Sequence, residues 1–591
     1  MAKESLKNPP NWNLSDFYSS IEDKKIDIDL KKISIESEKF VKNFLGKITK
    51  LDAKNLANAI KKYEEICEII GKISSYSYLI YASDLSNQNN LAFYQNISEK
   101  LSKYESSLVF FTLELNKIDD KKLTKFLKDS SSLKKYQPFI RDSRAFKKHQ
   151  LAESLEKLLL EKNISGRAGW VRLFDETVNN LKFTYNKKTI NSQEIFDLLS
   201  NNDEKIRKNA AKAIGKTFGE NAKIFAFITN ILAKDKSIDD EWRKFPNPIS
   251  ARNLSNFIED EVVEVMIKKV KENYATISHR YYKIKAKILG KKILNYWDRN
   301  APLSKNENKL ITWQEAQNLV LSAYGEFHPE MKKIGKIFFD KNWIDAKVTN
   351  GKDSGAFSHP TVPSIHPYIL MNYQGKTRDV MTLAHELGHG IHQYLSRSQG
   401  YLMSSTPLTL SETASVFGEQ LAFQKILKTE TNKEKKRLII AAKIEDMINT
   451  VVRQIAFLEF EKKVHEARKS GEISLIKLCE FWMEIQKESL GSAFKFDEEY
   501  KFFWCYIPHF IHSPFYVYAY AFGDCLVNSL YGVYKSGKIK GFEEKYLAML
   551  KLGGTKHHKE MLEPFGLNAQ DPEFWQAGLD VIINYINQLE S

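Results

Sequence analysis

The chain has 591 residues, 28% of them charged, and a formal net charge of +15 at pH 7. This length exceeds what one compact domain usually reaches, so two or more lobes are expected. The lysines are spread along the whole chain and mixed with acids, which is typical of solvated helix faces. The charge therefore gives no argument for a nucleic-acid partner, and none is expected.

The hydrophobic segments and the cysteines indicate the cellular compartment of the protein. No uncharged apolar stretch reaches the length of a membrane-spanning helix, and the first twenty residues lack the apolar core of a secretory signal. The four cysteines are scattered without a CxxC pair, which favours free thiols in a reducing environment. A cytoplasmic protein without a membrane partner is expected.

Glycine (26) and proline (15) are both scarce, and apolar residues recur at helical spacing, so the fold is predicted to be mainly α-helical. Successive amphipathic helices are expected from about Lys32 to Leu160. The segment from Leu181 to Asn191 has alternating runs around a polar NKK turn and predicts a short hairpin. Helices are expected to resume at Ser192.

The least helical part of the chain lies between Lys347 and Asp379. It holds three glycines and three prolines, together with a β-like run from Tyr368 to Tyr373. It leads directly into the run HELGHGIH, which begins at His385. Irregular structure in front of a candidate site often forms the wall of a cleft.

HELGHGIH lies in a predicted helix with one apolar stripe. His385 and His389 are four residues apart, so both imidazoles leave the same helix face, and this geometry suits zinc. Glu386 lies beside them and can take a proton from a water that zinc has made acidic. The alternative is a pair of surface histidines next to an ordinary glutamate, and only a third ligand separates the two interpretations.

Two residues are candidates for that third ligand. His392 lies two turns beyond His385, and one straight helix rarely supplies three ligands to one zinc, so His392 is expected to be a surface histidine or an outer-shell group. Glu412 follows His385 by 27 residues. If the chain reverses between the two, Glu412 returns to the histidines and completes a His₂Glu site with one open position.

The sequence offers such a reversal. Gly400 and Pro407 can turn the chain, and Ser411 can cap a new helix that begins SETASVFGEQLAF. Glu419 lies seven residues after Glu412 on the same helix face. It either orients a ligand histidine through the second ring nitrogen or is a partly buried structural carboxylate, and both interpretations stay open.

Several ordered motifs resemble the oligoendopeptidase F family, which is related to thimet oligopeptidase. The motifs include WNLSDFY (Trp12 to Tyr18), YWDRNAPL (Tyr296 to Leu303), GKDSGAF (Gly351 to Phe357), PYILMNYQG, TLAHELGHGIH, SETASVFGE and HSPFYVYAYAFG. Together they cover almost the whole chain.

The resemblance implies a helical, two-lobed, clam-like fold with a deep central cleft and a small β-sheet beside the active site. It implies a helical N-terminal region over residues 1–195 and a catalytic domain over 196–591. It also implies cleavage of internal bonds in oligopeptides and one zinc ion per chain. His385, His389 and Glu412 would bind that ion, with Glu386 as general base.

A zinc peptidase also needs donors for the oxyanion that forms during hydrolysis. Ser513 and Pro514 read as an N-cap and first helical position, so a helix is expected to start near Pro514 with His509 and His512 on the loop before it. Tyr518 with His509 is the preferred donor pair.

Tyr516 is the next choice, and Tyr520 is a third tyrosine of the same run. For each tyrosine the alternative is core packing with the hydroxyl group satisfied by another partner. Three alternating tyrosines cannot all face one metal site.

The run PYILMNYQG, which contains Asn372, is read as an edge strand to which an extended peptide could add. By resemblance GKDSGAF lies near the same wall, where its glycines allow a close backbone approach. Gly355, Ala356, Phe357 and Asn372 are therefore expected to contact substrate. The alternative for both segments is ordinary sheet and turn structure.

Two other functions remain open on sequence grounds. One is a zinc carboxypeptidase or dipeptidase on a related helical scaffold, which would need a cationic anchor for the substrate C-terminus. The other is a non-catalytic peptide-binding homologue, although the intact residues of the predicted site argue against it. Oligopeptides are the expected partners, and monomer and homo-oligomer are equally compatible with the pattern.

Overall fold

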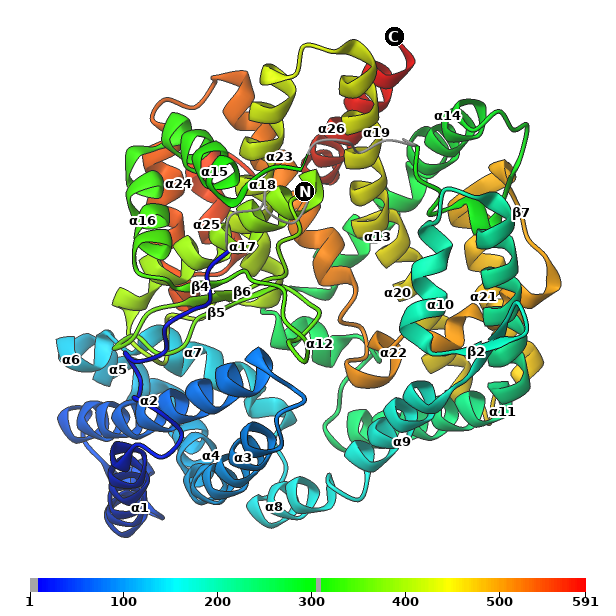
Figure 1. Ribbon diagram of the computed structural model, residues 1–591. Helices are drawn as coiled ribbons and strands as arrows, with labels where there is room; N and C mark the ends of the chain where they lie inside the picture. The colour runs from blue at the N-terminus through cyan, green and yellow to red at the C-terminus, as the bar shows by residue number, and fades with distance from the viewer. Residues whose placement is uncertain (1–8, 304–309) are drawn as a thin grey trace. The chain divides into compact units, whose positions relative to one another are not determined.

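The computed structural model describes residues 9–303 and 310–591 (Figure 1). Residues 1–8, which belong to the segment searched for a secretory signal, lie outside the described part. The described chain is mostly helical with three small sheets, so the prediction of a mainly α-helical fold is confirmed. No described helix is both long and apolar enough to span a bilayer.

Packing divides the chain into two units, each assembled from three separate segments. Unit 1 takes in the described residues of Met1–Glu153, Glu307–Thr429 and Gly537–Gly566, and unit 2 those of Ser154–Asn306, Glu430–Ser536 and Leu567–Ser591. The predicted domain boundary between residues 195 and 196 lies inside the short helix α10 (Ser192–Asp197) of unit 2. Packing and homology divide a chain by different criteria, so that boundary stays a prediction.

Unit 1 contains two groups of helices and a three-stranded sheet. Its elements are α1 (Lys24–Phe44), η2 (Ile48–Lys50), α2 (Ala53–Ser83), α3 (Gln88–Leu108), α4 (Phe110–Lys117), α5 (Asp120–Asp129), α6 (Ser131–Lys134), α7 (Gln137–Ala145), η3 (Phe146–His149), α15 (Trp313–Phe327), α16 (Pro329–Asp340), β4 (Ile344–Asp345), β5 (Phe357–His359), β6 (Tyr368–Leu370), α17 (Thr377–Ser396), η7 (Arg397–Gln399), α18 (Leu408–Thr429), α24 (Phe542–Lys551), η10 (Gly553–Thr555), α25 (His558–Leu562) and η11 (Glu563–Phe565).

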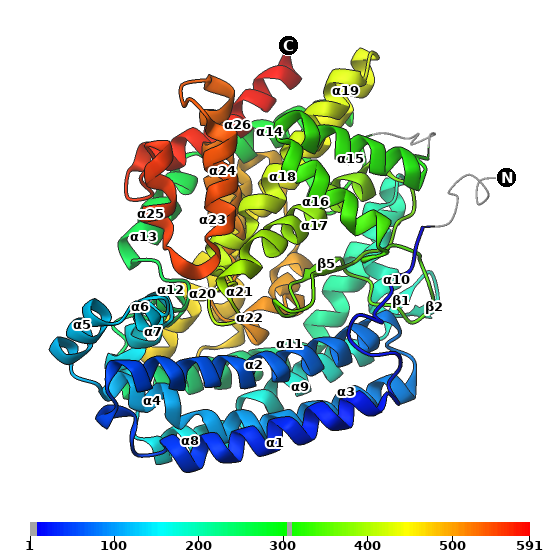
Figure 2. The same ribbon diagram turned by 90° about the vertical axis from the view of Figure 1, so that its left-hand side faces the viewer.

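The two helix groups of unit 1 follow from amphipathic sequence. In the first group α1 and α3 pack along α2, whose apolar stripe includes the fully buried Ile60, Ile73 and Leu79 (Figure 2). The N-terminus of α2 is capped by the Asp52 carboxylate, which accepts a hydrogen bond from the Asn55 backbone N–H. In the second group α15, α16 and α18 pack around α17, which carries the HELGHGIH motif.

The sheet of unit 1 has the order β4-β6-β5, with β6 parallel to β4 and antiparallel to β5. The PYILMNYQG run forms β6, so the prediction that it is an edge strand is wrong: both of its sides are already paired. The edge strand on the side of α17 is β5, which begins at Phe357, the last residue of the GKDSGAF motif. An added peptide strand would therefore meet β5.

Unit 2 is also mainly helical. Its elements are α8 (Glu153–Lys162), which begins at the last residue of unit 1, α9 (Arg167–Asn180), β1 (Phe183–Tyr185), β2 (Lys188–Ile190), α10, η4 (Leu198–Ser200), α11 (Glu204–Trp242), α12 (Ser250–Ser255), α13 (Asp260–Glu272), η5 (Ala275–His279), α14 (Arg280–Ile288), β3 (Leu294–Asn295), η6 (Tyr296–Asp298), α19 (Lys433–Thr450), α20 (Val452–Lys469), α21 (Leu475–Leu490), η8 (Gly491–Ala493), β7 (Phe494–Lys495), η9 (Glu498–Tyr506), α22 (His509–His512), α23 (Tyr518–Ser536) and α26 (Pro572–Glu590).

The predicted hairpin is confirmed as β1 and β2, which pair antiparallel. Its two-residue turn is formed by Asn186 and Lys187, with φ of 48° and 65°. Positive φ at both turn residues matches the right-handed twist of the strands, although lysine rarely adopts this conformation.

The prediction for the start of the helix after residue 513 is wrong. His509 and His512 form the short helix α22 instead of a loop, and α23 begins at Tyr518 instead of Pro514. Between them Phe515 has a φ of 57°, which no α-helix can contain. Its backbone N–H donates to the buried Glu461 carboxylate at 2.8 Å, so a residue 54 positions away delays the helix.

Candidate active site

The metal-binding motif lies on α17, which begins after a turn fixed by one carboxylate. Asp379 accepts hydrogen bonds from the backbone N–H groups of Gln374 and Lys376, at 2.8 and 3.0 Å. Val380, Leu383, Leu387 and Ile391 form the predicted apolar stripe and are fully buried. The helical repeat then leaves His385 and His389 on one partly exposed face.

The helix α18 packs antiparallel against α17. Contacts run in opposite order along the two helices, because His385 meets Glu419 while the later His392 meets the Ser411 backbone. Gly388 allows the close approach: a Cβ at this position would lie 2.7 Å from the Cα of Ser415.

The predicted reversal is therefore present, but the prediction that Ser411 caps the second helix is wrong. The helix α18 already begins at Leu408, and the Ser411 hydroxyl donates to the Leu408 carbonyl inside the first turn. The new helix thus starts one turn earlier than its serine suggested.

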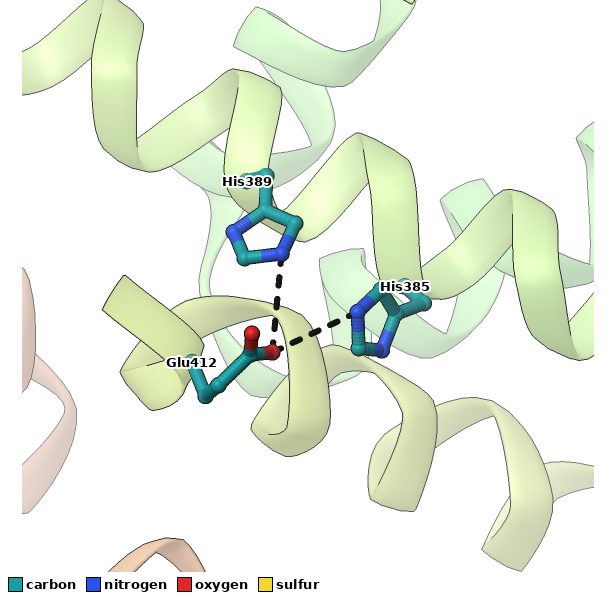
Figure 3. Close-up of side chains that lie close together, drawn as sticks. All are labelled: His385, His389 and Glu412. Carbon is teal, nitrogen blue, oxygen red and sulfur yellow. Dashed lines mark ion pairs between the residues drawn. The ribbon is translucent and has the colours of Figure 1, made fainter. Parts of the chain in front are cut away.

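Three donor atoms converge between the two helices. Glu412 Oε2 lies 3.4 Å from His385 Nε2 and 3.5 Å from His389 Nε2 (Figure 3). These three residues are the one group of His, Cys, Asp and Glu within the described chain whose donor atoms all lie within 4.8 Å of one another. Zinc bonds of about 2.0–2.1 Å at a tetrahedral angle place neighbouring donors about 3.3 Å apart, so the set fits a zinc ion.

Glu419 lies behind this cluster. Its Oε2 is 3.4 Å from His385 Nδ1, the ring nitrogen that faces away from Glu412. Burial disfavours the imidazolium, but the hydrogen bond with Glu419 and the charges of Glu412 and Glu386 outweigh it and raise the pKa of His385 to about 9. The placement matches an orienting carboxylate, the first of the two interpretations left open by the sequence.

Glu386 is buried beside the cluster but is not one of its three members. Burial raises the pKa of its carboxyl to about 7, and the charge of Glu412 acts in the same direction. Its Oε2 atom has no hydrogen-bond partner within the described chain. A carboxylate with a free oxygen and such a pKa has the properties of a general base.

His392 is separate from the three-residue cluster. The side chain is 3% exposed and bonds to the Ser411 backbone, and burial lowers its pKa to about 4. This placement matches the expected outer-shell position and not that of a fourth donor.

The predicted substrate-contacting residues surround the start of β5. Gly355 and Ala356 are exposed and Phe357 is half-buried. Asn372 uses its amide to hold this turn, donating to the Asp353 carbonyl at 2.8 Å and the Gly355 carbonyl at 3.4 Å. Asn372 therefore shapes the wall that the other three residues present.

The sequence did not single out the two residues that attach β5 to α17. The Ser358 backbone forms a hydrogen bond with the Glu386 carboxylate, and the Ser358 carbonyl accepts from Gln393 at 3.1 Å. The Ser358 hydroxyl donates to Gln393 at 2.8 Å. Only the position of Gln393 one helical turn after His389 could have suggested this role.

The predicted oxyanion donors all lie in unit 2, where they have different surroundings. The Tyr518 side chain is fully buried, and its hydroxyl accepts a hydrogen bond from Asn256 at 2.8 Å. Tyr518 therefore packs in the core with its hydroxyl group satisfied, which was the alternative to the oxyanion role in the sequence analysis. Tyr516 and Tyr520 are half-buried and pack against the His509 ring at centroid distances of 6.0 and 5.9 Å.

The Tyr520 hydroxyl also lies 3.5 Å from His509 Nε2. His509, Tyr516 and Tyr520 therefore form one group in unit 2, whereas Tyr518 of the predicted pair packs in the core.

Comparison with solved structures finds the same fold in other chains. A putative peptidase from Chlamydophila abortus superposes with a TM-score of 0.85 at 24% identity, covering 99% of this chain and 98% of that one. Oligoendopeptidase-F from Enterococcus faecium superposes with a TM-score of 0.73 at 21% identity, covering 96% and 98%. Both likenesses concern the fold.

Sequence comparison then gives the family. The family model for peptidase family M3 matches residues 197–581, and that for oligopeptidase F matches residues 114–183. An oligoendopeptidase F homologue from Borreliella burgdorferi is 30% identical over 573 residues, covering 96% of this chain and 95% of the relative. The chain belongs to peptidase family M3, and the resemblance to oligoendopeptidase F is confirmed.

Proposed function

We propose that the protein is a zinc-dependent oligoendopeptidase that hydrolyses internal bonds of short, unstructured peptides. The convergence of His385, His389 and Glu412 beside a buried Glu386 carries this proposal. Membership of peptidase family M3 supports the peptide substrate, and the names of relatives support cleavage of oligopeptides. The deep cleft implied by the family stays a prediction.

His385, His389 and Glu412 would hold the zinc ion, with Glu419 fixing the ring of His385. When bound, zinc would act as a Lewis acid on the scissile carbonyl and would lower the pKa of a water molecule. Glu386 takes one proton from the attacking water as the new C–O bond forms. It then passes that proton to the leaving nitrogen as the C–N bond breaks.

The oxyanion that forms on the carbonyl carbon needs hydrogen-bond donors. We assign this role to Tyr520 and Tyr516 with His509, because these three side chains form one half-buried group in unit 2. Tyr518 is assigned to the core.

All four cysteines are free thiols, which supports the expected reducing compartment and a cytoplasmic location.

The test combines metal analysis with internally quenched peptides of graded length and with free or blocked ends. The expected result is one zinc per chain and cleavage at internal bonds of both end-blocked and free peptides. Glu386→Gln should keep the metal and lose the activity. Absence of zinc, or no cleavage by the wild type, would refute the proposal. Release of C-terminal residues alone, abolished by amidation, would establish a carboxypeptidase instead.

A further inference from the structure

A pocket of about 590 Å³ lies in unit 1 directly beside the metal ligands. One wall is the C-terminal half of α17, from His389 to Ser396, together with Arg397, the first residue of η7. The others are the middle of α2, the residues after β5 and the loop over residues 401–406. Because His389 belongs to both the pocket and the ligand cluster, a peptide at the metal site would extend a side chain into this space.

The pocket has one fixed charge, and it is positive. Among the described residues that line it none is acidic, and Arg397 is the one lysine or arginine. The remaining polar lining consists of serine, threonine, glutamine, tyrosine and histidine side chains. Burial lowers the pKa of the lining residue His359 to about 4, so this histidine is neutral at pH 7. The charge of the pocket is therefore complementary to a carboxylate.

Arg397 is held in place without an acidic partner. Its Nη1 atom donates to the Ile365 carbonyl at 3.0 Å, and its guanidinium lies 4.1 Å from the centroid of the Tyr394 ring. No ion pair joins it to a carboxylate within the described chain. A half-buried guanidinium that is oriented by a carbonyl and an aromatic ring keeps donors for a two-point contact with a carboxylate.

A second polar atom in the pocket wall also has no partner. His392 lines the pocket with a side chain that is 3% exposed, and its Nε2 atom forms no hydrogen bond within the described chain. Buried polar atoms are nearly always paired, so this atom calls for a polar occupant beside it. Because the other ring nitrogen of this neutral imidazole bonds to the Ser411 backbone, Nε2 is an acceptor and calls for a hydrogen-bond donor such as a peptide N–H. The guanidinium alone indicates the carboxylate.

The strand β5 indicates which part of a peptide reaches the pocket. It runs from Phe357 to His359, and His359 and the next four residues line the pocket. A peptide added antiparallel to this edge would place the residues N-terminal to the scissile bond at the pocket. Arg397 follows His389 by eight residues, or about 12 Å of helix. With the reach of an arginine side chain, that corresponds to about two to four extended residues.

We propose that this pocket binds a carboxylate of the peptide substrate through Arg397, which makes Arg397 a residue that determines specificity. The orientation of β5 assigns the carboxylate to an aspartate or glutamate about two to four residues before the scissile bond. The other source of the same group is the substrate C-terminus, which would require a parallel peptide. The proposal rests on the proposed peptidase function.

The test uses internally quenched peptides of one neutral sequence, with Glu or Gln placed in turn at each of four positions before the cleaved bond. Each peptide is made with a free and with an amidated C-terminus. For the wild type, Glu should exceed Gln in kcat/KM at one position by roughly 10- to 100-fold, as expected for a hydrogen-bonded charge pair. The difference should appear in KM and persist after amidation.

Three variants sharpen the result. Arg397→Gln should remove the preference for Glu while keeping kcat/KM for the Gln peptide within about threefold. Arg397→Lys should keep part of it, since lysine provides the charge without the planar fork. Arg378→Gln is the matched control: Arg378 is exposed at the other end of α17, outside the pocket, and its loss should change nothing.

Each outcome has a separate meaning. A dependence on the free C-terminus that Arg397→Gln abolishes supports the carboxylate pocket and identifies the other source. Equal rates for all wild-type peptides, or a preference that survives Arg397→Gln, would overturn the proposal even if that variant folds poorly, because the wild-type ratio stands alone. Failure to cleave any peptide, neutral ones included, would refute the peptidase function instead.

Discussion

Two regions carry the side chains on which the proposed chemistry depends, and they are constructed differently. On α17 the helical repeat alone sets His385 and His389 on one face. Around residues 509–520 the chain contains a short helix, a residue with positive φ and then a longer helix. The first geometry is fixed by neighbours in sequence and the second by the distant Glu461. A local repeat can thus be read from sequence, whereas a turn held by a remote side chain cannot.

The largest expected effect tests whether the helix pair makes one metal site. Glu412→Ala should remove most of the zinc and essentially all peptidase activity, because it deletes one of three donors. The loss of zinc affinity should exceed the roughly 10- to 100-fold cost of removing an outer-shell partner. His392→Ala is the matched control and should keep the metal. Zinc content after dialysis measures both, and zinc retained in Glu412→Ala would contradict the assignment.

The next prediction separates the tyrosines of the second region. Tyr520→Phe should lower kcat by roughly 10²- to 10³-fold, the usual cost of removing one oxyanion donor. Tyr518→Phe should leave kcat unchanged and lower the melting temperature, because the buried Asn256 amide loses its acceptor. Steady-state kinetics and thermal melting on both variants decide the matter. A large fall in kcat in Tyr518→Phe alone would restore the sequence-based choice.

Because the distant Glu461 holds the turn at Phe515, the free energy of unfolding is also predicted to depend on pH. Burial raises the pKa of Glu461 from its ordinary value near 4.5 to about 8. A raised carboxyl pKa contributes stability that is complete below pH 4.5 and is lost as the pH rises through about 8. Between pH 6 and pH 8 the wild type should therefore lose about 2 kcal/mol, because the slope of about 1.4 kcal/mol per pH unit halves as the pH reaches the raised pKa.

Glu461→Gln should flatten this decline, since a neutral amide does not ionise. Denaturant titrations at pH 6 and pH 8 give the comparison, with Glu434→Gln on the exposed surface as the control. An equal decline in wild type and Glu461→Gln would show that Glu461 does not titrate in this range.

The smallest effect concerns the carboxylate behind the metal ligands. Glu419→Gln should weaken zinc binding by roughly 10- to 100-fold, because the ring of His385 loses its charged partner while Glu412 remains. Competition with a zinc chelator measures the change. Unaltered affinity, with only a lower melting temperature, would return Glu419 to the structural interpretation that the sequence also allowed.

The sequence predictions were accurate where neighbours in sequence set the geometry and inaccurate where distant residues set it. The ligand cluster could be predicted from the sequence, because the helical repeat places the two histidines on one face and a turn containing glycine and proline brings Glu412 back to them. The sequence did not predict three features: the start of α18, the central position of β6 and the positive φ of Phe515. The last two depend on distant segments, because the second neighbour of β6 and the carboxylate of Glu461 both come from elsewhere in the chain.

The interleaved segments of unit 1 bear on how the chain folds during synthesis. Arg141 donates from its Nη1 atom to the Thr555 carbonyl at 3.1 Å, across 414 positions of sequence. The helices α24 and α25 leave the ribosome after all the other α-helices of the same unit. Unit 1 therefore cannot close until they emerge, and its apolar helix faces must wait for these final partners. Such long-range closure slows folding and exposes the nascent chain to aggregation, which makes it a substrate for chaperones.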